Sequence, residues 1–216
     1  MANDQFIEVV QGTPEWHALR CGKVTASRID DVMAKGKGDA ESASRRNYRM
    51  ELVVERRTGI QQEGFVSRDM ILGQEREPIA RARYEVARGV LVREVSFIDH
   101  RSIPMCGASP DGLVGDDGML ELKCPKAATH YGYIMGNKVP ADYQLQMLWQ
   151  MECANRKWVD FGSYCPEFDR DRQLFIRRFY RDDERLKVIR EAVVDFERQV
   201  SMAAMALDSV LMIDEV

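Results

Sequence analysis

The pattern of apolar and polar positions predicts helices in the first part of the chain. Apolar residues at helical spacing, bounded by capping residues and glycine, predict four helices, at residues 14–19, 25–33, 45–57 and about 68–86. On the last of these, the spacing predicts four core-facing side chains, those of Ile71, Leu72, Ile79 and Tyr84. The polar, glycine-bearing segment 35–44 is expected to be a mobile loop.

The pattern changes after Gly89, where short apolar runs alternate with glycines and aspartates. These runs predict strands, at residues 91–97, 105–108, 112–114 and 119–124. A helix over 141–154, strands over 158–164 and 174–179, and a helix over 182–207 complete the prediction. The fold class is therefore α/β, a single domain over residues 1–216 with a central mixed, mostly antiparallel sheet flanked by helices.

Length, charge and cysteine content narrow the classes of protein. A chain of 216 residues suits one domain, and no apolar run approaches the roughly 20 residues of a membrane helix. We therefore expect a cytoplasmic protein of a bacterial or phage-infected host cell, without a membrane partner. Five cysteines without metal-ligand spacing fit that compartment and are expected to be reduced. The net charge of −4 argues against nonspecific coating of nucleic acid. Two arginine-rich stretches, 45–57 and 170–181, are either local phosphate-binding surfaces or solvated faces balanced by acids.

One short segment carries the strongest chemical signal. Glu121 and Lys123 are two apart in a predicted strand and project from the same face, and Asp111 ends the adjoining strand. Two carboxylates facing each other there would suit Mg²⁺, which prefers oxygen ligands and shares its shell with phosphate. The alternative is an exposed strand edge that carries a Glu–Lys ion pair.

These residues form a motif that resembles the PD-(D/E)XK nucleases. The chain resembles more closely the lambda exonuclease and viral recombinase family, whose fold has a restriction-endonuclease-like core. The matching segments follow the family's order: Glu15-Trp16-His17, Leu19-Arg20, Gly22, Thr25-Ala26-Ser27, Gly73 with Glu77, Ser109-Pro110-Asp111-Gly112-Leu113, Glu121-Leu122-Lys123-Cys124-Pro125, and Gln144-Leu145-Gln146.

The resemblance implies roles for the residues around the motif. Asp111, Glu121 and the carbonyl of Leu122 would bind Mg²⁺, for which Mn²⁺ would substitute, and Lys123 would position the attacking water. Glu77 would add a further carboxylate, although Glu75 stands nearby. Gln144 is favoured over Gln146 as the residue that reaches the nucleophile or the scissile phosphate. The family's tyrosine one turn earlier is replaced by Ala141, with Tyr143 adjacent.

The resemblance also implies contacts with DNA. Arg20, Ser27 and Ser109 would bind the 5′-phosphate of the digested strand, a role that suits a guanidinium and two hydroxyls. The alternative for the first two is a surface arginine and a helix cap. Met70 would be a wedge that splits the duplex end, or else a buried helix residue. Lys37, in the loop, would contact the unpaired strand.

The function implied is a Mg²⁺-dependent 5′-to-3′ exonuclease that acts on double-stranded DNA ends and leaves 3′ single strands for recombination. The resemblance also implies that the protein forms a homotrimeric ring around DNA and that its partner is a single-strand annealing protein. Two alternatives remain: an endonuclease of the same superfamily that acts on structured DNA, and a noncatalytic DNA-end-binding recombination protein.

Overall fold

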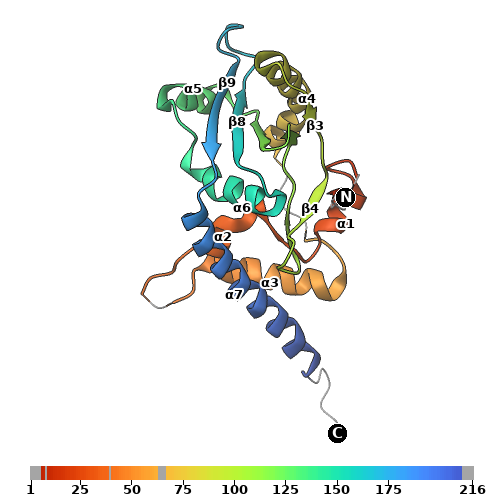
Figure 1. Cartoon of the computed structure of the whole chain (residues 1–216). Helices are drawn as coiled ribbons and strands as arrows, with labels where there is room; N and C mark the ends of the chain where they lie inside the picture. The colour runs from red at the N-terminus through yellow and green to blue at the C-terminus, as the bar shows by residue number, and fades with distance from the viewer. Residues whose placement is uncertain (1–5, 8, 39, 63–66, 211–216) are drawn as a thin grey trace.

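The larger of two sheets has five strands in the order β3-β6-β7-β8-β9 (Figure 1) in the computed structural model, which describes residues 6–7, 9–38, 40–62 and 67–210. The strands are Val92–Arg93 (β3), Gly112–Val114 (β6), Gly118–Lys123 (β7), Trp158–Tyr164 (β8) and Leu174–Tyr180 (β9). β7 and β8 are parallel, and the other neighbours are antiparallel. The predicted mixed, mostly antiparallel sheet is confirmed.

The central strand of this sheet is β7. Its first five residues are buried, so both of its faces are covered. Alternation still separates the two faces, because Leu120 and Leu122 pack in an apolar cluster with Ala80 and Tyr84, while Glu121 and Lys123 point the other way. The alternative of an exposed strand edge is therefore wrong.

A second, four-stranded sheet was not predicted. Its order is β1-β4-β5-β2, and its strands are Phe6–Ile7 (β1), Phe97–Asp99 (β4), Cys106–Ala108 (β5) and Val24–Thr25 (β2). The run 91–97, predicted as one strand, is divided between the two sheets because the chain bends at Ser96. Strands of two or three residues carry too little alternation for the sequence to specify their partners.

Seven α-helices surround the sheets within the described residues. They are Pro14–Arg20 (α1), Ile29–Met33 (α2), Ala43–Thr58 (α3), Arg68–Arg88 (α4), Ala127–Gly136 (α5), Gln144–Ala154 (α6) and Asp183–Asp208 (α7), with 3₁₀ turns at Ala26–Arg28 (η1) and Ala141–Tyr143 (η2). The sequence did not predict α5. Only His130 of this helix is buried, so it lacks the apolar stripe from which a helix is recognised.

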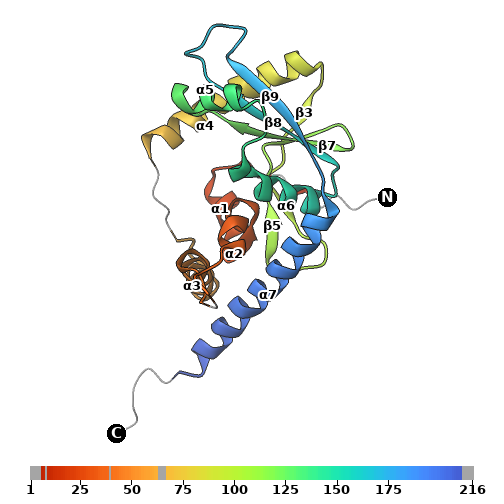
Figure 2. The same ribbon diagram turned by 90° about the vertical axis from the view of Figure 1, so that its left-hand side faces the viewer.

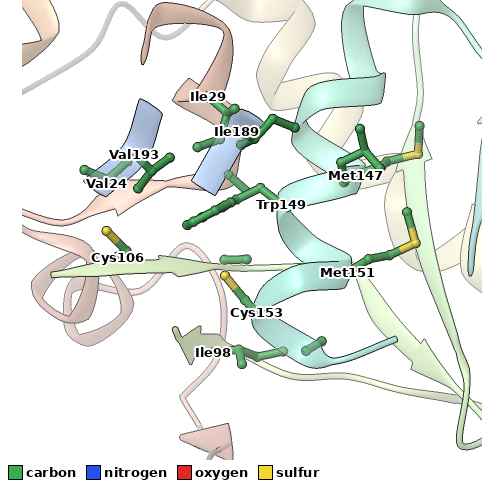
Figure 3. Packing of buried hydrophobic residues seen from close by; sticks show 14 of the residues in the cluster. Val24, Ile29, Ile98, Cys106, Met147, Trp149, Met151, Cys153, Ile189 and Val193 are labelled. Carbon is green, nitrogen blue, oxygen red and sulfur yellow. The ribbon is translucent and has the colours of Figure 1, made fainter. Parts of the chain in front are cut away.

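Helix α6 lies at the centre of the main core. It contacts strands of both sheets and also packs against α2 and α7 (Figure 2). Its residues from Met147 to Met151 are buried, and Trp149 is fully enclosed between Ile29 and Ile189 on one side and Ile98 and Cys106 on the other (Figure 3). Because α6 is held on all sides, any side chain that it points at β7 is fixed in position.

The orientation predicted for α4 is largely wrong. Ile71, Leu72 and Ile79 are 48%, 41% and 53% exposed, whereas Tyr84 is buried as predicted. Only the C-terminal half of α4 packs on the five-stranded sheet, through Ala80 and Tyr84. Ile79 lies next to the buried Ala80 and is itself exposed, so the helix turns a different face to the sheet from the one predicted.

Capping residues set the ends of α3, which packs across α7 (Figure 1). Ser42 Oγ accepts the Arg45 N–H at 3.2 Å, and Gly59 ends the helix with a left-handed φ of 68°. All five cysteines are free, which confirms the prediction of reduced thiols. Among the described residues, no helix has the length and apolar character needed to cross a membrane.

Candidate active site

The antiparallel pair β6–β7 brings Asp111 against the backbone of β7. Gly112 pairs with Leu120, so Asp111 stands one residue before β6, beside the end of β7 that carries Glu121 and Lys123. Its Oδ2 accepts the backbone N–H of Leu122 at 2.6 Å. Glu121 is only 1% exposed, and Asp111 is half-buried. The two carboxylates therefore face a common, largely enclosed space.

Pro110 explains why the carbonyl of Leu122 is available as a ligand. The register of β6 and β7, continued by two residues, would place Leu122 opposite Pro110. Proline has no N–H to donate, so the ladder cannot continue there. In a strand the N–H and C=O of one residue point to the same side. The Leu122 carbonyl thus points toward the side on which Asp111 accepts its N–H.

Lys123 is held between a carboxylate and an aromatic ring. Its Nζ lies 2.5 Å from Glu121 Oε1 and 5.1 Å from the ring centroid of Tyr143. Burial lowers the pKa of the Lys123 ammonium, but attraction to Glu121 and Asp111 outweighs burial and raises the pKa above its ordinary value. Lys123 is therefore a fixed positive charge beside the carboxylates. The sequence left open whether a tyrosine contributes to the site, and in the structure Tyr143 lies beside Lys123.

Three carboxyl groups, those of Asp111, Glu121 and Glu77, lie close enough at the site to repel one another when charged. Burial raises the pKa of Asp111 well above its ordinary value, and the nearby charges of Glu121 and Glu77 raise it further. Burial also raises the pKa of Glu77, against the attraction of Arg81. A bound cation would relieve both effects.

The donors present fit Mg²⁺ better than a metal that needs a full protein cage. In the described part of the chain, no group of three or more His, Cys, Asp or Glu side chains is arranged to hold a metal ion. Mg²⁺ and Mn²⁺ accept fewer protein ligands, because waters and substrate phosphate complete the shell. Two carboxylates and the Leu122 carbonyl could supply such an oxygen set.

The structure brings Gln146, and not Gln144, to the carboxylates. Gln144 points away from the carboxylates: its Oε1 accepts from Arg185 at 3.0 Å, and its Nε2 donates to the Val139 carbonyl at 3.4 Å. Gln146 Nε2 instead donates to Glu121 Oε1 at 2.7 Å, and Gln150 Nε2 donates to Glu121 Oε2 at 2.6 Å. Residues four apart share a helix face, whereas residues two apart do not.

Gln150 was missed from the sequence, although a signal was present. It lies four residues after Gln146 within a stretch of α6 that is otherwise apolar. Glu77 is favoured over Glu75 by the structure, since Glu77 is half-buried and interacts electrostatically with Glu121, whereas Glu75 is exposed.

Two of the three residues predicted to bind a 5′-phosphate meet at Trp16. The Arg20 guanidinium lies 4.0 Å from the centre of the Trp16 ring, and Trp16 Nε1 donates to Ser109 Oγ at 3.1 Å. Arg20 Nε is buried and has no hydrogen-bond partner among the described residues, and burial lowers the pKa of Arg20. Arg20 is partly buried, and its role in a phosphate pocket stays a prediction.

Ser27 lies farther from this pair. It is exposed and lies inside η1, where its Oγ is 3.4 Å from Thr25 Oγ1. It caps neither η1 nor α2, so the alternative of a helix cap is wrong. No hydrogen bond of the described structure joins Ser27 to Arg20 or Ser109, and its place in a phosphate pocket stays a prediction.

The two residues predicted to contact separated strands are both exposed. Met70 is 53% exposed in the first turn of α4, so it is not a buried helix residue. Lys37 is exposed in the segment that joins α2 to α3. Their roles on DNA stay predictions.

The arginine-rich stretches are mainly paired with acids. Ion pairs join Arg45 and Arg49 to Glu41, Arg56 to Glu197, Arg57 to Asp208, Arg178 to Asp160, and Arg181 to Glu152 and Asp183. For these residues the interpretation as balanced faces is confirmed.

Comparisons with known proteins agree with this geometry. Residues 15–157 match the model of the YqaJ-like viral recombinase domain family. An alkaline exonuclease (LHK-Exo) from Laribacter hongkongensis is 44% identical, with a TM-score of 0.85 over 91% of this chain and 96% of that chain; its complex with dAMP matches equally well. A phage related exonuclease from Haemophilus somnus 129PT, 15% identical, shares the fold at a TM-score of 0.70 over 88% of this chain and 99% of that one. Among curated proteins none matches.

Proposed function

The chain belongs to the YqaJ-like viral recombinase domain family and is a DNA exonuclease, and we propose that it is Mg²⁺-dependent, starts at double-stranded ends and digests the 5′ strand. The product would be a 3′ single strand suited to recombination. The observation that carries the proposal is the arrangement of Asp111, Glu121 and Lys123 around the C-terminal end of β7.

Each residue of this arrangement has a chemical task. Asp111, Glu121 and the Leu122 carbonyl would hold Mg²⁺, which supplies a water of lowered pKa and offsets charge on the scissile phosphate. Lys123 would orient the attacking water and stabilise the charge that develops on the phosphate. Gln146 joins them because its amide reaches the same Glu121 oxygen as Lys123 does. We therefore assign to Gln146 the role that the resemblance implied for Gln144, which is to reach the nucleophile or the scissile phosphate.

The polarity rests on the pair formed by Arg20 and Ser109. The unpartnered Nε of Arg20 is a donor for an anion, and Ser109 is tied to the same indole. A terminal 5′-phosphate bound there, with help from Ser27, would hold the strand so that its next phosphodiester lies near Asp111. LHK-Exo has been solved with dAMP, a mononucleotide of the kind that such cleavage releases.

Assembly and partners extend the proposal. A homotrimeric ring would keep an acidic chain on DNA by enclosing the duplex, with its positive groups lining the hole. A single-strand annealing protein would receive the 3′ strand, in the cytoplasm of the cell. The exposed side chains of Met70 and Lys37 would contact the separating DNA strands.

The experiment that tests this function uses duplex DNA labelled at one end. Purified protein with Mg²⁺ is incubated with linear duplex carrying the label at either the 5′ or the 3′ end, and with a closed circle. We expect rapid release of the 5′ label, late release of the 3′ label and an intact circle. Cleavage of the circle would favour the endonuclease alternative, and binding of ends without digestion would favour the noncatalytic one.

A further inference from the structure

Gln150 is a fully buried polar residue at the back of the site. Its side chain is 0% exposed, and its Nε2 donates to Glu121 Oε2 at 2.6 Å. Its Oε1 is buried and has no hydrogen-bond partner among the described residues. The neighbours Met147, Trp149 and Met151 on the same helix are apolar and also 0% exposed.

Stability alone does not account for an amide at this position. A buried acceptor without a partner costs about 1–3 kcal/mol, which an apolar residue of similar shape would avoid. Methionine is such a residue, and α6 already uses it at positions 147 and 151. The amide is therefore explained by what its N–H does for Glu121.

The direction of the amide follows from the charge of its partner. Rotation of the amide by half a turn would place Oε1 of Gln150 against Oε2 of Glu121, where two acceptors repel. With Nε2 toward Glu121, the buried carboxylate oxygen is satisfied by a neutral donor. The other oxygen, Oε1, receives Lys123 and Gln146 from the partly exposed side.

We propose that Gln150 is a positioning residue that holds Glu121 by its buried oxygen and so keeps Oε1 turned toward the open side for a divalent cation. A neutral amide adds no second positive charge beside Glu121, which already pairs with Lys123. This inference rests on the proposed metal-dependent function. Outer partners of this kind typically change metal affinity by about 10- to 100-fold.

The test is direct binding of Mn²⁺ alone, measured by calorimetry without DNA, to the wild-type chain and to Gln150→Met. We expect the variant to bind Mn²⁺ about 10- to 100-fold more weakly. Its melting temperature in EDTA should change little, because removal of the unpartnered acceptor opposes the loss of the donor to the buried Glu121 Oε2. In cleavage assays the Mg²⁺ concentration for half-maximal rate should rise, while the rate at saturating Mg²⁺ changes less.

Met147→Leu is the matched control, since it alters a fully buried apolar residue one turn away on α6 and removes no hydrogen bond to Glu121. It should leave Mn²⁺ affinity unchanged. Gln150→Leu serves as a second variant in case Gln150→Met folds poorly. Loss of the folded state in both variants would overturn the inference, because the amide would then be a structural requirement.

Two further outcomes separate this inference from the function beneath it. If the wild type binds Mn²⁺ and Gln150→Met binds it equally well, Gln150 does not position Glu121, and the proposed function still stands. If the wild type neither binds Mn²⁺ nor cleaves with any divalent metal, the proposed function fails, and the role of Gln150 fails with it.

Discussion

The backbone N–H of Leu122 donates to Asp111 Oδ2 at 2.6 Å, where the β6–β7 ladder would otherwise continue. This bond fixes a carboxylate at the end of a central strand, beside the buried Glu121. Asp111 therefore contributes both a hydrogen-bond acceptor and a negative charge, and a substitution can remove the charge while it keeps the acceptor.

Asp111→Asn should abolish cleavage but stabilise the metal-free protein. Asparagine still offers an oxygen to the Leu122 N–H but carries no charge. Since burial and neighbouring carboxylates raise the folded pKa of Asp111, its stabilising contribution is present at low pH and is lost as pH rises through that pKa. At neutral pH in EDTA the variant should therefore melt at a higher temperature. Asp116→Asn, in the exposed β6–β7 turn, is the control and should change neither property.

Lys123→Ala should lower the cleavage rate by about 10²- to 10⁴-fold with little change in DNA affinity, as expected for a group that acts in the transition state. Lys123→Arg should restore little activity, because a planar guanidinium does not reproduce an ammonium 2.5 Å from Glu121 Oε1. Single-turnover rates and binding in Ca²⁺ measure the two effects. Near-normal turnover of Lys123→Ala would make Lys123 a structural ion-pair partner only.

Substrates with a 5′-phosphate should be digested faster than those with a 5′-hydroxyl. A charge-assisted hydrogen bond contributes about 1.5–3 kcal/mol, which corresponds to a preference of about ten- to a hundredfold. Arg20→Ala should remove most of this preference, while Arg46→Ala, an exposed arginine of α3, should retain it. Rates are compared at fixed ionic strength. Equal rates on both ends with the wild type would refute the phosphate pocket and leave the metal site standing.

Glu152 should contribute stability that depends on pH. The pKa of Glu152 is held down to about 2 by His100, Arg190 and Arg181. His100 Nε2 is 3.9 Å away, whereas the arginines are at 2.6 and 2.5 Å, so we attribute most of the effect to the arginines.

Because the folded pKa of Glu152 is lowered, its contribution is complete above the unfolded pKa of roughly 4.3 and is lost as pH falls toward 2. Glu152→Gln should therefore lower the free energy of unfolding by roughly 2–3 kcal/mol at pH 7 and by much less near pH 2. Urea titrations at both values measure this. Exposed Glu191→Gln is the control, and an equal deficit at both pH values would contradict the prediction.

The sequence was sufficient to predict which side chains meet where those residues lie close together along the chain. Asp111, Glu121 and Lys123 belong to one short hairpin, so the two-residue period of a strand and the register of its neighbour place them. Helix ends marked by Ser42 and Gly59 were also close to their predicted positions.

The sequence failed where position depends on distant packing. The rotation of α6, which directs Gln146 and Gln150 rather than Gln144 to Glu121, is set by contacts with both sheets and with α2 and α7. The exposure of Ile71 and Ile79 depends on which face of α4 packs on the sheet, through Ala80 and Tyr84. The division of 91–97 between two sheets depends on strand partners that short strands do not specify.

The most direct test of the central claim is the metal dependence of digestion by the wild type and by Glu121→Gln. Linear duplex is incubated with each protein in Mg²⁺, in Ca²⁺ and in EDTA, and released nucleotides are measured. We predict digestion only by the wild type in Mg²⁺, with Ca²⁺ supporting DNA binding but little cleavage because its looser coordination suits the site poorly. Robust digestion in excess EDTA, or by Glu121→Gln in Mg²⁺, would contradict the account.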